Sequence, residues 1–173
     1  MLVRRSQQLQ LRFRTVPLAD LWQQLQVLTQ RLSSSQSVQI NCAALPLTAS
    51  AQLWIDPDKL LQALQIILDN AIRYSHARQP VNVDVDVGEQ CRISVRDCGI
   101  GIAPDDLPFV FNRYFRAGNA RNLRPDGLGI GLSLCETLIR GLHGTIELAS
   151  EQQQGTTVTV ILPLIEEDEE CKS

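Results

Sequence analysis

The chain has 173 residues, of which 44% are hydrophobic, and this length suits one domain with its own core. Its 16 basic and 19 acidic residues give a formal net charge of −3, without a basic block in the body of the chain. A surface for nucleic acid or anionic lipid is therefore not expected. We predict no nucleic-acid partner and no direct membrane contact.

The cysteines and the hydropathy further limit the class of protein to which the chain can belong. The five cysteines are odd in number and scattered, so neither a disulfide framework nor a structural zinc site is expected; they are Cys42, Cys91, Cys98, Cys135 and Cys171. No apolar stretch approaches the roughly 20 residues that cross a bilayer. The N-terminus also lacks the apolar core of a signal peptide. These features predict a cytoplasmic location.

The first third of the chain predicts one helix and two strands. Residues 1–16 alternate briefly, as a strand or the tail of a preceding helix would, and we interpret them as a linker. Leucines at helical spacing predict a helix over 17–32, which SSSQS at 33–37 should end. The alternating segments 38–43 and 51–56 predict half-buried strands around a proline-containing turn.

The remainder predicts a helix, a hairpin, a long loop, a helix and a second hairpin. Asp56 and Pro57 should begin a helix that ends near Tyr74. Strands are expected at 81–87 and 91–97, a non-periodic loop at 99–127, a helix over 128–142 that stops at His143-Gly144, and strands at 144–150 and 155–163. The acidic residues 165–173 predict a solvated, disordered tail.

This order of elements predicts the fold class α+β. We expect a two-layer α/β sandwich, in which about three helices cover one face of a mixed, mostly antiparallel sheet.

Three stretches carry polar or glycine-rich signals. At 3.6 residues per turn, Ile66, Asn70, Arg73 and Tyr74 share one helical face that could hold a charged ligand. In DCGIG at 97–101, the glycines would let backbone approach a flat ligand, and Asp97 could accept a hydrogen bond from an exocyclic amine. An ordinary turn containing an aspartate is the alternative.

GLGIG at 127–131 opens a predicted helix, where backbone N–H groups and the helix dipole favour phosphate. A dinucleotide-binding fold is disfavoured because the glycines follow a long loop rather than an early strand. A Walker loop is excluded because no GK[ST] follows.

Together these residues resemble a known family. DNAIRYS, DCGIG, VFNRYFR, GLGIGLSL and GTTVTVILP stand in the order found in the catalytic, ATP-binding domain of two-component sensor histidine kinases, a branch of the GHKL (Bergerat-fold) ATPases. The resemblance runs from about Val16 to Pro163 and implies an ATP-binding kinase domain over 17–164, with a long lid over the ATP. Residues 1–16 would then connect to a missing dimerisation domain.

The resemblance implies a reaction and its partners. The domain would bind ATP and Mg²⁺ and donate the γ-phosphoryl group to a histidine on that separate dimerisation domain, for relay to an aspartate of a response regulator. No phosphoacceptor histidine is expected here, because neither His76-Ala77 nor His143-Gly144 looks like one.

Residue roles follow from the same resemblance. Asn70 would be the Mg²⁺ ligand, Arg73 would meet phosphate and Tyr74 would cover adenine. Asp97 would receive the adenine amine above Gly99 and Gly101, and Thr156 would hold a water against adenine. The implied nucleotide-binding set also contains Ile102, Phe111, Gly127, Leu128, Gly129, Ile130, Gly131 and Leu132.

The lid would carry the F box of the family, which comprises Phe109, Phe111, Arg113, Phe115 and Arg116. Arg113 and Arg116 are the candidate catalytic residues that reach the γ-phosphate, with Arg121 and Arg124 as alternatives. The plainer interpretation makes the phenylalanines ordinary core and the arginines solvated.

One departure keeps other functions open. The family usually has a second asparagine one turn before Asn70, and this chain has Ile66, which predicts weaker metal and phosphate binding or slow turnover. A degenerate nucleotide-binding regulatory module without phosphotransfer is one alternative, and an anti-sigma-type serine kinase is another. Lesser possibilities are a nucleotide contact by His76 and oxidation sensing by Cys98.

Overall fold

The computed structural model describes residues 10–46, 50–123 and 127–165. A five-stranded sheet forms one layer, in the order β2 (Ile40–Cys42), β4 (Val81–Val87), β5 (Gln90–Arg96), β7 (Gly155–Pro163) and β6 (Thr145–Glu151). Strands β2 and β4 are parallel, and the other neighbours are antiparallel. The sheet is therefore mixed and mostly antiparallel, as predicted.

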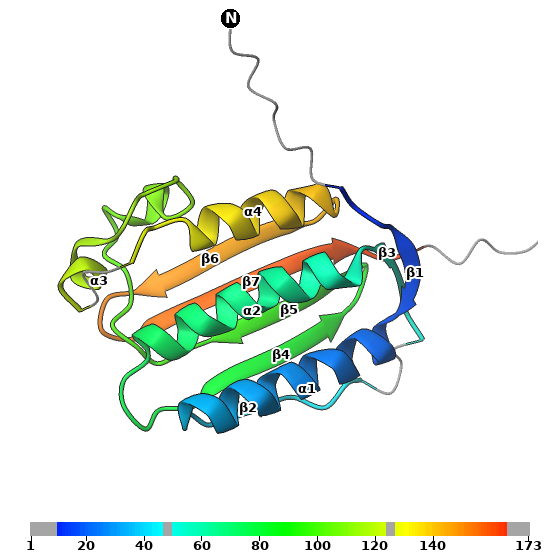
Figure 1. The fold of residues 1–173 in the computed structure, drawn as a ribbon, viewed down its shortest axis with the longest axis horizontal. Helices are drawn as coiled ribbons and strands as arrows, with labels where there is room; N and C mark the ends of the chain where they lie inside the picture. Colours follow the sequence, from blue (N-terminus) through cyan, green and yellow to red (C-terminus); the bar gives the residue numbers. More distant parts are fainter. Residues whose placement is uncertain (1–9, 47–49, 124–126, 166–173) are drawn as a thin grey trace, which may run out of the picture.

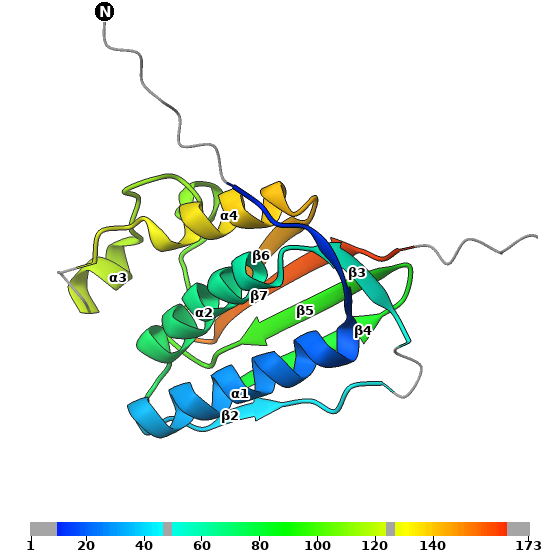
Figure 2. The same ribbon diagram turned by 45° about the vertical axis from the view of Figure 1, so that its right-hand side comes forward.

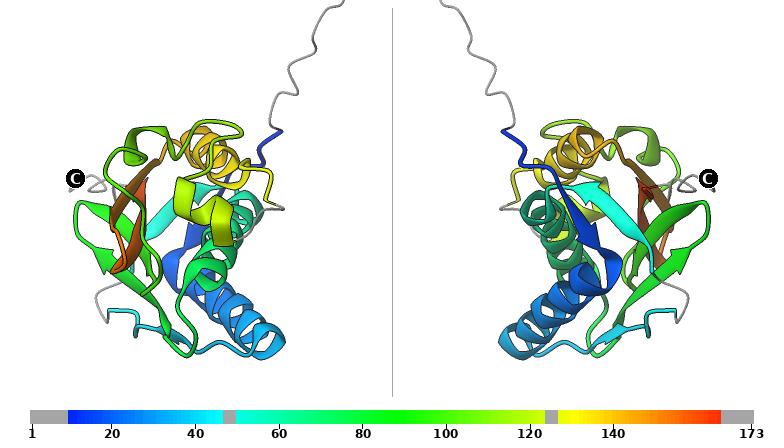
Figure 3. Two further views of the ribbon diagram at one scale, coloured as in Figure 1. Left: turned by 90° about the vertical axis from the view of Figure 1, so that its left-hand side faces the viewer. Right: turned by 90° about the vertical axis from the view of Figure 1, so that its right-hand side faces the viewer.

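Three helices form the second layer, on one face of the sheet (Figures 1 and 3). They are α1 (Leu18–Gln36), α2 (Pro57–Tyr74) and α4 (Gly131–Gly141). The core lies between the layers, because the buried side of each helix meets the inward-facing half of each alternating strand. Fully buried side chains include Leu21, Leu25, Leu64, Ile67, Leu68, Ile93, Leu138 and Ile139. This arrangement confirms the predicted two-layer α+β fold.

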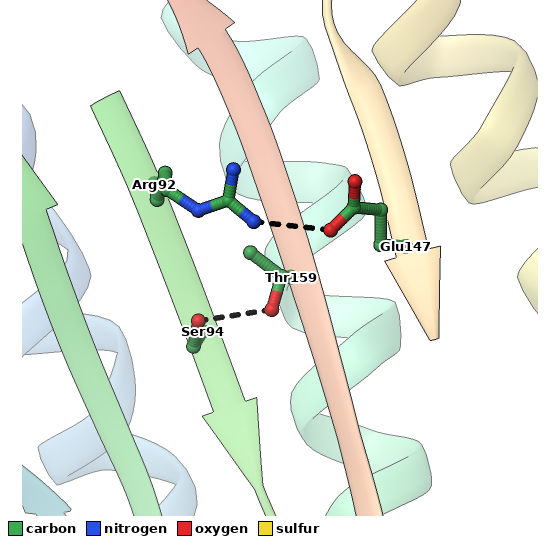
Figure 4. Close-up of polar contacts among 4 residues, drawn as sticks. All are labelled: Arg92, Ser94, Glu147 and Thr159. Carbon is green, nitrogen blue, oxygen red and sulfur yellow. Dashed lines mark hydrogen bonds and ion pairs between the residues drawn. The ribbon is translucent and has the colours of Figure 1, made fainter. Parts of the chain in front are cut away.

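In the part of the chain that the structure describes, no helix covers the other face of the sheet (Figure 3). This face is polar where side chains pair across strands (Figure 4). The hydroxyl groups of Ser94 and Thr159 lie 3.0 Å apart, and Arg92 Nη2 lies 3.0 Å from Glu147 Oε2. Alternation along β5 explains this split, since Cys91, Ile93 and Val95 face the helices while the residues between them face outward.

A separate two-stranded sheet closes the end of the sandwich opposite α3 (Figures 1 and 2). It pairs β1 (Arg14–Pro17) with β3 (Gln52–Ile55). Phe13 lies between Trp54 and His143, with ring centroids 6.2 and 5.5 Å away. Strand β1 thus begins three residues before the expected start of the domain at residue 17, and the domain boundary itself stays a prediction.

Two helix boundaries differ from those predicted. Helix α1 continues through Ser33–Gln36 and ends only where Ser37 adopts a left-handed conformation (φ 53°), so the serines do not stop it. Helix α4 begins at Gly131 instead of Leu128, which leaves most of GLGIG ahead of the helix. Its end is as predicted, because His143 turns to φ 61° and Gly144 N donates to Ile139 O.

The long loop predicted at 99–127 contains two short helices, a 3₁₀ turn over Leu107–Phe109 and α3 (Gly118–Leu123). Neither has enough turns to produce a detectable hydrophobic period. Within the three described ranges, no helix is both long and apolar enough to cross a membrane.

Candidate functional site

The structure contains a cavity of about 490 Å³. Its lining residues come from the end of the sandwich where α2 finishes and α3 lies, and Figure 1 shows how these elements are arranged. Its walls come from the last turns of α2, the floor loop (97–102) after β5, the lid segment (103–123 and 127–130 as described), the start of α4, and β7. Five segments of the chain therefore meet around one space.

Most of the predicted site residues line this cavity. They are Asn70, Arg73, Tyr74, Asp97, Gly101, Ile102, Arg116, Gly127, Leu128, Gly129, Ile130, Gly131, Leu132 and Thr156. Three do not. Gly99 is buried just behind the wall, Phe111 is half-buried in the lid, and Arg113 is exposed on the lid.

The side of α2 that was predicted to face a ligand forms part of the cavity wall. Ile66, Asn70, Arg73 and Tyr74 all line the cavity, since residues three and four apart lie on the same side of a helix. A side chain carbon added to Gly131 would lie 3.2 Å from Ile66 Cγ2 and 3.8 Å from Asn70 Nδ2. The apolar Ile66 therefore stands next to the start of α4, beside the amide of Asn70.

Asp97 is the charged group most deeply set in the site, with 6% of its surface exposed. Its Oδ1 accepts from Gly99 N at 2.9 Å and from Thr156 N at 3.3 Å. Burial raises the pKa of Asp97 from 3.8 to about 6, against the two backbone hydrogen bonds and the nearby His76, which lower it. Both recorded bonds fall on Oδ1, so Oδ2 is the oxygen left to accept from a ligand.

Ser150 was missed by sequence reasoning. Its hydroxyl lies 2.8 Å from Thr156 Oγ1, accepts from Ile102 N at 2.9 Å and donates to Gly155 O at 2.9 Å. It thus ties the floor loop to β7 and fixes the Thr156 hydroxyl at the cavity wall. A single serine within a strand carries no pattern that would have identified it.

The start of α4 brings backbone N–H groups to the cavity. Ile130, the residue before the helix, makes no side-chain cap, although the first N–H groups of a helix have no partner within it. Gly131 and Leu132 belong to the cavity wall. An uncapped helix start in this position favours a negatively charged ligand.

The lid segment contributes apolar and polar wall residues. Phe115 lines the cavity and packs against Phe109 with ring centroids 5.7 Å apart. Tyr114 N donates to Gly129 O at 2.8 Å, and Arg116 Nη2 donates to Ala120 O at 3.1 Å. Arg121 is exposed, and the alternative Arg124 lies outside the described residues.

Asn119, in α3, was also missed. It lines the cavity, and its Nδ2 donates to Gly101 O at 2.7 Å and to Ile100 O at 3.5 Å. Its Oδ1 accepts from Ala120 N at 2.9 Å. The acceptors are backbone carbonyl groups, which every residue carries. The sequence therefore could not have indicated this contact.

The two lesser candidates, His76 and Cys98, do not line the cavity. His76 is exposed and does not line the cavity, and Cys98 is half-buried with no cysteine partner among the described residues. No group of three histidine, cysteine, aspartate or glutamate side chains that could hold a metal ion exists in the described part of the chain. The Asn70 amide oxygen could hold a divalent cation here, together with water and oxygens of the ligand itself.

Comparison with known proteins places this geometry in a family context. Residues 55–166 match the family model described as "Histidine kinase-, DNA gyrase B-, and HSP90-like ATPase". Sensor histidine kinase WalK of Bacillus subtilis is 39% identical over 119 residues, which cover 67% of this chain and 20% of WalK. Sensor protein SrrB of Staphylococcus aureus is 36% identical over 109 residues, covering 62% of this chain and 19% of SrrB.

Among solved structures, the mycobacterial sensor histidine kinase MprB superposes with a TM-score of 0.71 at 22% identity. The match covers 88% of this chain and 98% of the MprB chain, and it shows a shared fold. The chain spans about a fifth of the length of the curated relatives it matches.

Proposed function

Because the chain belongs to the family of histidine kinase-, DNA gyrase B- and HSP90-like ATPases, we propose that it is the ATP-binding catalytic domain of a two-component sensor histidine kinase. It binds Mg·ATP and donates the γ-phosphoryl group to a histidine on a separate dimerisation domain, and an aspartate of a response regulator is the onward acceptor. The convergence of Asn70, Asp97 and the GLGIG segment on one cavity carries the proposal.

Adenine occupies the Asp97 side of the cavity. Asp97 Oδ2 accepts from the exocyclic amine, and the Thr156 hydroxyl, held by Ser150, binds a water next to the ring. The apolar walls from Ile102, Val95 and Val158 suit a flat aromatic base, with Tyr74 at the edge.

The triphosphate lies toward Arg73 and the start of α4. The N–H groups of Gly131 and Leu132 in the first turn of α4 and the helix dipole stabilise its negative charge. Arg116 is placed by the lid at the same cavity, and Arg113 lies further out on the lid. These guanidinium groups neutralise charge on the γ-phosphoryl group as it leaves ADP.

The donor set fits Mg²⁺. An amide oxygen is a hard ligand, and Mg²⁺ characteristically keeps several waters and bridges phosphates rather than taking a full cage of protein ligands. Asn70 supplies that oxygen from a half-buried position on the cavity wall. When bound, the ion would neutralise phosphate charge, and the residues of this chain would orient the triphosphate.

Phosphoryl transfer here is a matter of positioning and charge. An imidazole nitrogen of the acceptor histidine forms a bond to the γ-phosphorus while the bond from that phosphorus to the β–γ bridging oxygen breaks, which releases ADP. The chain offers no carboxylate at the position of Ile66 that could activate water instead. Hydrolysis through a general base at that position is therefore disfavoured.

Ile66 also supports a second candidate, a regulatory module that orders its lid on nucleotide binding without transferring phosphate. Its side chain places hydrocarbon beside Gly131, next to the proposed metal ligand. A site with a single amide ligand could hold nucleotide yet orient the γ-phosphoryl group poorly.

One experiment separates the two. The chain is incubated with Mg²⁺, γ-labelled ATP and a matched histidine-containing dimerisation domain supplied in trans. Acid-labile label on the acceptor supports the kinase, while nucleotide binding without transfer supports the regulatory module, and absence of binding contradicts both. Asn70→Ala should abolish transfer and Asn41→Ala, on the open face of the sheet, should not. Label on a histidine of the chain alone would contradict the proposal that the acceptor lies elsewhere.

A further inference from the structure

Backbone hydrogen bonds join the floor loop to two other parts of the cavity surroundings. Ile100 N donates to Tyr74 O at 3.1 Å, at the end of α2. Ile100 O accepts from Gln153 N at 2.8 Å, in the turn between β6 and β7. The loop is therefore fixed to the body of the domain on two sides.

The lid joins this fixed loop through Asn119. Its amide donates to Gly101 O at 2.7 Å, with a longer contact of 3.5 Å to Ile100 O. The same side chain accepts from Ala120 N, so both of its polar atoms are used. One residue of α3 thus spans from the lid to the floor across the cavity wall that it helps to form.

Two other polar contacts near α3 lie within the lid. Gly118 N donates to Asp106 Oδ2 at 3.1 Å, and Arg116 Nη2 donates to Ala120 O at 3.1 Å. These bonds shape α3 but do not hold it to the floor loop. The Asn119 amide, in contrast, connects α3 directly to the floor loop.

We infer that Asn119 is a positioning residue that sets the closed position of the lid over the nucleotide. This inference rests on the proposed function, because it concerns the same cavity. A lid closed over a ligand slows its release, and a clasp formed in the closed state adds its free energy to binding. The geometry requires a donor at this position, since both partners are carbonyl oxygens.

Two substitutions test the donor. Asn119→Ala removes it, and Asn119→Asp keeps the shape and the bond from Ala120 N but turns a carboxylate oxygen toward two carbonyls. Each should weaken ATP binding and speed its release by about tenfold, the effect of losing one hydrogen bond of ordinary net strength. Asn119→Asp should be at least as severe as Asn119→Ala. Asn112→Ala and Asn112→Asp, at an exposed lid residue, are the matched controls and should bind as the parent does.

A second measurement does not depend on nucleotide. Amide hydrogen exchange across 103–123 in the nucleotide-free chain should be about tenfold faster in both Asn119 variants, while exchange in α2 and the sheet stays unchanged. If the substitutions merely destabilised the whole domain, amide exchange in α2 and the sheet would become faster as well.

The outcomes separate the two proposals. If the parent binds no adenosine nucleotide, the proposed function fails, while faster lid exchange would still report the clasp. If the parent binds ATP and the Asn119 variants match it in affinity or in lid exchange, the inference is wrong. An equal loss in the Asn112 variants would also overturn it, because the effect would then belong to the lid in general.

Discussion

Asp97 and Thr156, 59 residues apart in sequence, hold each other by two hydrogen bonds. Asp97 N donates to Thr156 O at 2.9 Å, and Thr156 N donates to Asp97 Oδ1 at 3.3 Å. The first bond aligns the two strands where β5 ends. The second orients the carboxylate so that one oxygen is engaged by the protein and the other is left for a ligand.

Asp97→Asn should weaken the binding of ATP and of adenosine alike. A hydrogen bond to a charged group contributes about 1.5–3 kcal/mol, so the loss corresponds to about 10- to 100-fold in affinity. Calorimetric titration with both ligands measures it. Asp84→Asn removes the same charge from an exposed position on β4 and should leave both affinities unchanged. Equal affinities for parent and Asp97→Asn would remove Asp97 from the adenine site.

Adenosine affinity should fall as the pH drops through about 6, where burial has raised the pKa of Asp97. Only the carboxylate accepts freely from the amine, so one pH unit below the pKa should cost about tenfold in affinity. Adenosine is the ligand of choice because it has no phosphate group that titrates in this range. His76→Gln tests the source of the effect, and the fall should persist in that variant. A flat profile between pH 5 and about 7 would contradict the prediction.

The same carboxyl group should make folding stability depend on pH. Its pKa is about 6 in the folded chain against 3.8 ordinarily, so the folded state binds the proton more tightly. This stabilisation is fully present below the ordinary pKa and is lost as the pH rises through about 6. Asp97→Asn should therefore gain stability relative to the parent as the pH rises from about 4 to about 7, as measured by urea unfolding. A constant difference across this range would show that the group does not titrate as described.

Ile66→Asn should strengthen binding of Mg·ATP more than binding of ATP in the presence of a chelator. The new amide lies one helical turn from Asn70 on the cavity wall, where it can offer a second hard oxygen to the ion or its waters. We expect a gain of about tenfold in the ratio of the two affinities, which matches one good ligand contact. Ile66→Leu serves as the control for repacking beside Gly131. An unchanged ratio and an unchanged transfer rate would mean that Ile66 does not limit the site.

Gly101→Ala should destabilise the floor loop. Gly101 has a φ of +61°, and a side chain carbon there would run into the carbonyl of Glu151. The left-handed backbone alone costs about 1–2 kcal/mol for alanine, and the contact forces a further shift of the backbone. Urea unfolding should show a loss of at least about 2 kcal/mol, together with faster lid exchange. Gly88→Ala, where nothing lies within 4 Å, is the matched control.

Local patterns in the sequence determined the layers and the motif order of this protein. Helical spacing identified α1, α2 and α4, and alternation identified β2 to β7 but not β1. Asp56 with Pro57 marked the start of α2, where Asp56 Oδ1 accepts from Lys59 N. The polar side of α2 was predictable for the same reason, because residues at helical spacing share a face wherever the helix lies. The α1 boundary was wrong because serine only weakly opposes a helix that tertiary packing favours.

Only the tertiary structure decided how these elements meet. It paired β3 with β1 rather than with the main sheet and joined Asp97 to Thr156. It also brought Asn119 to the cavity and set Ser150 against Thr156 in the cavity wall. The reason is that these contacts end on backbone carbonyls and amides, which every residue carries, and that their partners are distant in the chain. A periodic pattern reports which side of an element is buried, whereas the choice of partner depends on packing of the whole domain.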